Sequence, residues 1–164
     1  PMAVSTLLSN AFGFHPINGP GLSIPLMEGY EKASQTFKDG AILKRDTGTL
    51  AVAGADNTAD IVGVAAAPAS GTTNDRRQYV LAAGNIFEAT LEDQSNEAHA
   101  LVIANLYTDY AAQVDSSGNY YIDENDTTNT CVMIVGANKS DIDNATVRAR
   151  VLCVFLADTL AQQT

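Results

Sequence analysis

Residues 37–54 read FKDGAILKRDTGTLAVAG and open the stretch of sequence that decides the fold. Two short β-forming runs, Ala41–Arg45 and Thr49–Ala53, flank the three residues Asp46–Gly48. Gly48 can take the positive φ that a short bulged turn requires. Two such runs around a turn predict a β-hairpin.

Two further apolar segments follow the hairpin. ADNTADIVGVAAAP (residues 55–68) begins as an acidic loop of small residues and predicts a short strand around Gly63. RRQYVLAAGNIFEATL (residues 76–91) predicts a long apolar strand. The stretch 37–91 contains no motif of a catalytic nucleophile, a metal cluster or a phosphate loop, so we interpret it as scaffold.

The same order of elements recurs later in the chain. DYAAQV and NYYID flank a second turn at Asp115–Gly118, and the acidic loop DENDTTNT, the strand CVMIVG and the long strand VRARVLCVFLA follow. Two such halves, 37–91 and 110–157, that each expose an apolar face would pair into a closed unit. We therefore expect a mainly β protein, with a small β-barrel or sandwich domain over residues 37–164 built from two similar hairpin-containing halves.

One short helix is expected between the halves. Ser95 followed by Glu97 indicates an N-terminal cap for a helix over Ala98–Leu106. The pair Val102-Ile103 fits a strand equally well, so the segment is ambiguous by pattern alone.

Residues 1–36 differ from the rest and predict an extended N-terminal arm. Seven of the seventeen residues from Gly13 to Gly29 are Gly or Pro, which disfavours regular secondary structure. The segment is nevertheless too apolar for a solvated tether. We interpret it as an arm that lies on a partner's surface, with packing on its own domain as the alternative. The contact residues we expect are Leu7, Leu8, Phe12, Phe14, Ile17, Leu22, Ile24 and Leu26.

Composition and charge limit the classes of partner. Among 164 residues, 19 are acidic and 9 are basic, which gives a net charge of −10. Binding to phosphate backbones or anionic lipid needs clustered Lys and Arg, so neither nucleic acid nor membrane is expected as a partner. Cys131 and Cys153 lie inside apolar runs and are expected to be free buried thiols.

The sequence offers no catalytic constellation. An EF-type calcium loop starting at Asp123 would need glycine at its sixth position and glutamate at its twelfth, and these positions hold Thr128 and Ile134. There is no G-x-S-x-G, H-E-x-x-H or glycine-rich phosphate loop. We expect no enzyme activity, no cofactor and no metal. The alternative is a metal- or sugar-binding barrel that uses the acidic loops Asp123–Asp126 and Asp141–Asp143.

Residues 37–157 resemble the small β-rich decoration (cement) proteins of tailed-bacteriophage heads. The resemblance covers about three-quarters of the chain and lies in the order and the general residue character of four segments, FKDGAILKRDTGTLAVAG, ADIVGVAAAP, YVLAAGNIFEATLED and VRARVLCVFL. It implies a non-enzymatic homotrimer that binds the major capsid protein on the outer surface of the virion and reinforces the shell. Another virion β-module, such as a head-fibre base or a tail component, is the alternative within this class.

Overall fold

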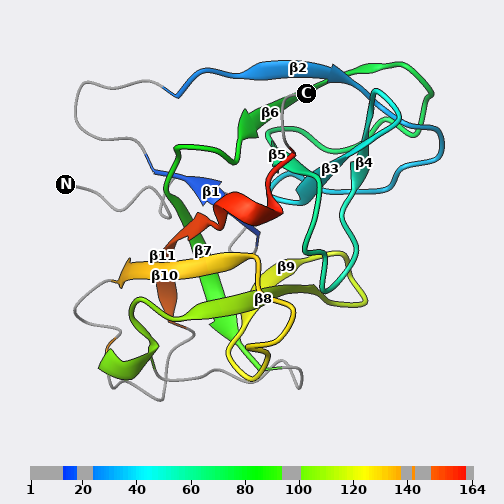
Figure 1. The fold of residues 1–164 in the computed structure, drawn as a ribbon. Helices are drawn as coiled ribbons and strands as arrows, with labels where there is room; N and C mark the ends of the chain where they lie inside the picture. The colour runs from blue at the N-terminus through cyan, green and yellow to red at the C-terminus, as the bar shows by residue number, and fades with distance from the viewer. Residues whose placement is uncertain (1–12, 18–23, 94–100, 138–141, 143–148, 162–164) are drawn as a thin grey trace.

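The computed structural model describes residues 13–17, 24–93, 101–137, 142 and 149–161. It is mainly β, with helix confined to 3-10 turns among these residues, and consists of a closed five-stranded barrel and a second sheet (Figure 1). The predicted fold class is therefore confirmed. In Figure 1 the second sheet lies above the barrel, and the chain crosses between them several times.

The barrel is closed by a parallel contact between two strands from different halves of the sequence. Leu91 and Glu92 lie opposite Ile122 and Asp123, while every other strand pair in the barrel is antiparallel. A two-residue strand, β1 (His15–Pro16), pairs with β7 beside this contact. The barrel strands, in spatial order, are β7 (Phe87–Glu92), β11 (Arg150–Phe155), β10 (Val132–Ala137), β8 (Asp109–Val114) and β9 (Tyr120–Asp123).

The second sheet is antiparallel throughout and is nearly closed by a bridge between its two edge strands. Glu31, just after one edge strand, forms a parallel bridge with Leu50 in the other. The Lys32 N–H also donates to the Leu50 carbonyl at 2.9 Å. The strands, in spatial order, are β2 (Met27–Tyr30), β6 (Arg76–Leu81), β5 (Ile61–Ala65), β3 (Ile42–Asp46) and β4 (Thr49–Val52).

The two halves have the same strand order, as the repeated sequence pattern predicts. In the first half the order is β4-β3-β5-β6, and in the second it is β9-β8-β10-β11, with every neighbouring pair antiparallel. Each half therefore begins with a hairpin, whose first strand also pairs with the third strand.

The long strand predicted over residues 76–91 is divided in two. A turn at residues 82–86, where Gly84 has a φ of 75°, separates β6 from β7. β6 stays in the second sheet and β7 enters the barrel. Both strands contribute to the core, so the only sequence signal of the turn is Gly84-Asn85, whose Asn85 amide donates to the Leu81 carbonyl at 2.9 Å.

The predicted first hairpin is confirmed, but its turn has two residues and no bulge. Asp46 lies opposite Thr49, and the two loop residues Thr47 and Gly48 have φ values of 47° and 83°. Two consecutive positive φ values are typical of a type I′ turn, whose twist matches that of the flanking strands. The second hairpin is also formed, and the Asp115 carboxylate accepts the N–H groups of Ser117 and Asn119.

One hydrophobic core runs through both sheets. Phe14, Phe87 and Phe155 meet in it, with ring centroids 5.6 Å apart for Phe14–Phe155 and 5.4 Å for Phe87–Phe155. Cys131 and Cys153 are buried free thiols, as predicted. Burial raises the pKa of Cys131 to about 12, so this thiol stays protonated at neutral pH.

The described part of the predicted N-terminal arm packs on its own chain. Phe14 is fully buried, and is therefore a core residue and not a contact residue. The segment also forms regular strands, β1 and β2, although its Gly and Pro content argued against them. Both strands are short. In β2, the glycine at position 29 leaves room for the Leu50 side chain, because a Cβ added there would lie 2.6 Å from Cδ1 of Leu50.

The predicted short helix is present only as a 3-10 turn, η2 (Ile103–Asn105). Residues 94–100, which include its expected cap, lie outside the described residues. Leu101 forms a bridge with Ile142, and this extended pairing excludes a helix that continues through Leu101. A second 3-10 turn, η4 (Ala157–Thr159), precedes the contact between Ala161 N–H and the Ile61 carbonyl at 2.8 Å.

Backbone and side-chain hydrogen bonds join the second sheet to the barrel. The Tyr120 hydroxyl donates to the Ala53 carbonyl, and the Asp56 N–H donates to the Ala112 carbonyl at 3.2 Å. The Gln113 amide donates to the Asp56 carboxylate. The β4–β5 loop, which contains Asp56, is therefore fixed to β8 in the β8–β9 hairpin of the barrel.

We predict that Gly63→Ala destabilises the protein by roughly 2–3 kcal/mol, because overpacking in a close contact forces the backbone to move. An added Cβ at Gly63 would lie 2.2 Å from the Val80 carbonyl oxygen. Urea unfolding measures the change. Gly54→Ala is the matched control, since an added Cβ there meets nothing within 4 Å. Equal stability of the two variants would contradict the predicted contact.

We also predict that Asp56→Asn raises stability at pH 7 by a fraction of a kcal/mol. Desolvation and the charge of Asp126 raise the pKa of Asp56 above its ordinary value of 3.8. The Asp56 carboxyl group thus binds its proton more tightly in the folded state than in the unfolded state. The stability of the protein therefore falls as the pH rises from the ordinary pKa of this group through its raised pKa. The gain is small because Asp56 is exposed.

Thermal unfolding between pH 3 and 7 measures this effect, and the Asp56→Asn variant and the wild-type protein should converge at the acid end. Asp60→Asn is the control, since it removes an ion pair to Arg45 (2.9 Å) and should lower stability slightly at pH 7. A loss of stability at pH 7 in Asp56→Asn would refute the prediction.

Candidate interaction site

β2 forms an exposed apolar edge on the second sheet. Leu26 and Tyr30 are 52% and 49% exposed, and Met27 between them is also exposed. Leu81 at the end of β6 and Ile86 in the β6–β7 turn are further exposed apolar side chains. Single exposed apolar residues are ordinary, but several along one strand and its neighbouring turn indicate an interaction surface. We call these five residues the β2 surface.

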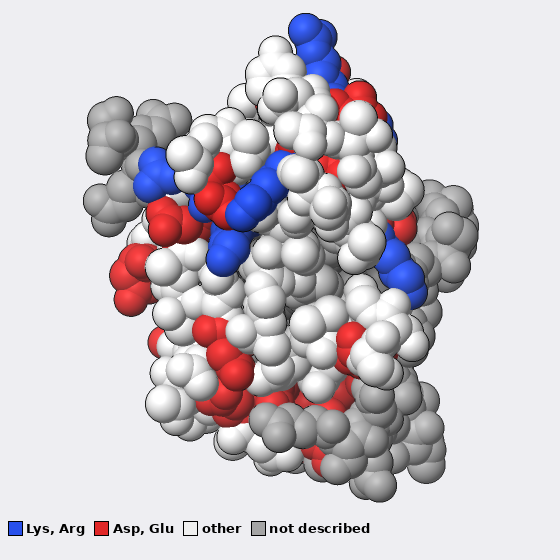
Figure 2. All heavy atoms as spheres, turned by 90° about the vertical axis from the view of Figure 1, so that its right-hand side faces the viewer, with Lys and Arg blue, Asp and Glu red and all other residues white. Residues whose placement is uncertain are grey.

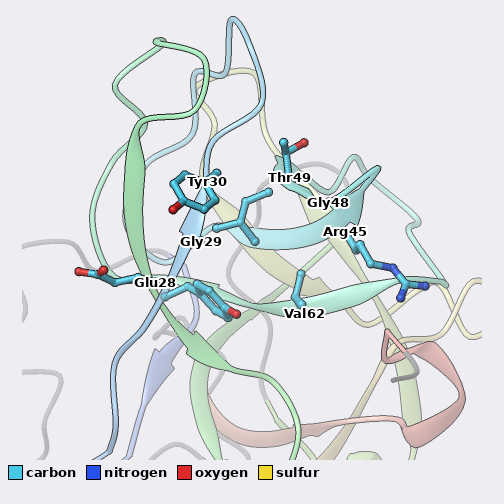
Figure 3. A pocket seen from close by; sticks show the side chains of 9 residues that line it. Glu28, Gly29, Tyr30, Arg45, Gly48, Thr49 and Val62 are labelled. Atoms are coloured by element: carbon cyan, nitrogen blue, oxygen red, sulfur yellow. The ribbon is translucent and has the colours of Figure 1, made fainter. Parts of the chain in front are cut away.

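A shallow hollow of about 300 Å³ lies between β2 and the β3–β4 hairpin (Figure 3). Figure 3 shows Glu28 and Arg45 at opposite ends of the hollow, with Val62 between them. Arg45 is paired with Asp60, so the charge at its end is balanced. The lining residues are Glu28, Gly29, Tyr30, Arg45, Gly48, Thr49, Leu50, Val62 and Tyr79.

A second hollow, of about 250 Å³, shares Glu28, Gly29 and Tyr30 with the first and is also lined by Arg76. Arg76 and Glu28 form an ion pair with 3.8 Å between the charged atoms. Both hollows therefore border β2, which carries polar and apolar groups next to them. Such a strand can contact an extended segment of another protein through its side chains and its backbone.

The position of β2 depends on the buried carboxylate of Glu31. This side chain is fully buried and accepts the N–H groups of Ser70 (2.9 Å) and Gly71 (2.7 Å) and the Ser70 hydroxyl (3.2 Å). Arg77 lies 3.5 Å from the same carboxylate. A buried carboxylate needs such partners to offset its desolvation. Glu31 thereby anchors the end of β2 to the β5–β6 loop.

Charge is distributed unevenly between the two parts of the chain. Residues 1–81 contain seven acidic and six basic residues, while residues 82–164 contain twelve acidic and three basic residues. Figure 2 shows the consequence on one face, where the Lys and Arg side chains lie in the upper part and acidic side chains dominate the lower part. The barrel end is therefore strongly acidic and the second sheet is nearly neutral.

The predicted contact residues of the arm fall into three groups. Leu26 is exposed on the β2 surface, Ile17 and Ile24 are partly buried, and Phe14 is in the core. Leu7, Leu8, Phe12 and Leu22 lie outside the described residues. The structure thus brings only Leu26 to an exposed position among the predicted residues that it describes.

The acidic loop that begins at Asp123 is held together by hydrogen bonds. Asp126 accepts the N–H groups of Thr128 and Asn129, and these bonds lower its pKa. Asp141 and Asp143 lie outside the described residues. Within the part of the chain that the structure describes, no group of three or more His, Cys, Asp or Glu side chains is placed to hold a metal ion.

No helix among the described residues is both long and apolar enough to cross a lipid bilayer. The chain matches no protein-family model, and it matches no curated protein sequence.

Sequence reasoning missed Tyr30 and Arg76 as surface residues. Tyr30 is a β-forming residue next to a predicted loop, and only the pairing of β2 with β6 brings it opposite Arg76. The exposed side chains of Ile103 and Tyr107 were also missed, because their segment reads as a buried helix or strand. No local pattern distinguishes an exposed apolar residue from a core residue.

We predict that Glu31→Ala destabilises the protein by about 2 kcal/mol or more. It removes a fully buried side chain together with the acceptor of the Ser70 and Gly71 N–H groups, so packing and part-buried hydrogen bonds are lost at once. Urea unfolding measures the effect. Glu28→Ala is the control, since its ion pair is exposed and contributes under about 1 kcal/mol. A Glu31→Ala variant as stable as Glu28→Ala would refute this role of Glu31.

Proposed function

We propose that the protein is a non-enzymatic capsid decoration protein that binds the outside of a tailed-phage head as a homotrimer. It would reinforce contacts between subunits of the major capsid protein. The observation that supports this best is the β2 surface, because it gives the second sheet a set of exposed apolar side chains at one edge. The resemblance of residues 37–157 to decoration proteins supports the same function.

The closed barrel and the nearly closed second sheet suit a load-bearing module. A closed barrel has no free edge for strand addition, so the edge strand β2 of the second sheet is the better candidate for such a contact. The described chain offers hollows of about 250 and 300 Å³ that are shallow and lined by mixed side chains. Such hollows suit contact with a protein segment better than enclosure of a small ligand.

Threefold association would multiply weak contacts. If two or three apolar side chains of the β2 surface make contact, one copy binds with modest affinity, and three linked copies bind far more tightly. The N-terminal segment would contribute to the same contact through the predicted residues Leu7, Leu8, Phe12, Ile17, Leu22, Ile24 and Leu26. Phe14 is not among them, because it is in the core.

Co-sedimentation with capsid shells of the encoding phage tests this function. Removal of residues 1–12, combined with Leu26→Ser, should lower shell occupancy at least tenfold and leave the melting temperature nearly unchanged. The truncation ends before Gly13, because a longer one would remove Phe14 and β2. Thr58→Ala, at an exposed position of the β4–β5 loop, is the matched control.

The wild-type protein should also sediment alone at three times the mass of one chain. Failure of the wild-type protein to bind shells would reject the proposed function. Unchanged occupancy in the truncated Leu26→Ser variant would reject the assignment of the contact to the arm and β2.

A further inference from the structure

The segment Val102–Thr108, which we call the Tyr107 turn, presents apolar side chains to solvent at the acidic end of the molecule. Ile103 is 69% exposed and Tyr107 is 73% exposed, and Val102 is exposed beside them. No other described stretch of seven residues outside the β2 region carries three exposed large apolar side chains. The turn therefore concentrates apolar surface where the sequence is otherwise acidic.

The Tyr107 turn is rigid. The Asn105 side chain accepts the Val102 N–H at 2.8 Å and donates to the Tyr110 hydroxyl at 2.8 Å. Leu101, directly before the turn, is fully buried. At the other end the Tyr107 N–H donates to the Ile134 carbonyl at 2.7 Å. A preorganised backbone loses little conformational freedom on binding, and this favours affinity.

Tyr107 has a φ of 59°, in the left-handed region that side chains other than Gly and Asn rarely adopt. A glycine would relieve this strain and would suit a turn. The chain instead carries a large aromatic residue that points mostly into solvent. Strained residues of this kind are concentrated at functional sites, and tyrosine is among the residues that dominate binding energy at interfaces.

The charge around the turn indicates the chemistry of the partner. Asp109 is exposed directly after it, and residues 82–164 contain twelve acidic and three basic residues. A second copy of this chain would bring like charges together at this end, and anionic lipid or nucleic acid would be repelled. The complementary partner is a protein with an apolar socket bordered by Lys and Arg.

We propose that the Tyr107 turn is a second contact with the capsid shell, where Ile103 and Tyr107 enter an apolar socket with a basic rim. In Figure 1, η2 lies at the lower left, beside the start of β8, and β2 runs along the top, so the turn is a contact separate from the β2 surface. This inference rests on the proposed function, since it names the chemistry of the shell site.

Shell binding by the full-length chain tests the inference. Tyr107→Gly and Ile103→Ser should each weaken binding at least tenfold, and Tyr107→Phe should bind as the wild type does. Tyr107→Gly should keep or raise the melting temperature, because glycine relieves the strained φ. A purely structural tyrosine would give the opposite result, a lower melting temperature with unchanged binding, and that would overturn the inference.

A charge reversal tests the basic rim separately. Asp109→Lys should weaken shell binding several-fold at low salt, with the difference shrinking as salt rises. Asp158→Lys, an exposed acidic residue in η4 of the same half, is the matched control and should change binding little. If the two charge reversals weaken shell binding equally, the proposal that the socket has a basic rim is overturned.

The outcomes separate the two proposals. If the wild-type protein does not bind shells, the proposed function fails and the Tyr107 contact fails with it. If the wild-type protein binds and both Tyr107→Gly and Ile103→Ser bind equally well, only the Tyr107 contact fails. If either variant changes the mass of the free protein, the turn is a contact between copies, and the shell assignment is overturned.

Discussion

The parallel pairing of β7 with β9 is the contact on which the rest of the structure depends. The four strands of the second half form an antiparallel sheet with two edges, and β7 from the first half fills the space between β11 and β9. This contact removes both edges, which would otherwise be open to association with other chains. The antiparallel pairing of β7 with β11 on its other side brings Phe87 to Phe155, which also contacts Phe14.

Local features of the sequence predicted the repeated part of the fold well, and long-range features were not predictable. Gly48 and Gly118 mark both hairpins because turn geometry is set by adjacent residues. The division of residues 76–91 was missed because the turn signal Gly84-Asn85 is short and is flanked by apolar residues on both sides. The burial of Phe14 was missed as well, because it depends on Phe155, which lies far away in the sequence.

The candidate site was predicted less well than the fold, for a physical reason. Exposure of an apolar side chain depends on the whole tertiary structure, and periodicity predicts only which residues prefer burial. Leu26 was predicted as a contact residue from the composition of its segment, whereas Tyr30 and Tyr107 required the strand pairing and the backbone angles. Hydrogen bonds from polar side chains fix both surfaces. Glu31, directly after β2, accepts the Ser70 N–H, and Asn105 in the Tyr107 turn accepts the Val102 N–H.

The order of strands in the barrel also affects when the protein can fold during synthesis. β11 lies between β7 and β10, and it is the last of the described strands to leave the ribosome. Until then β7 lacks its main partner, although the second sheet already has all five of its strands. The nascent chain should therefore form the second sheet first and close the barrel only after β11 has emerged, with β7 exposed to chaperones in the interval.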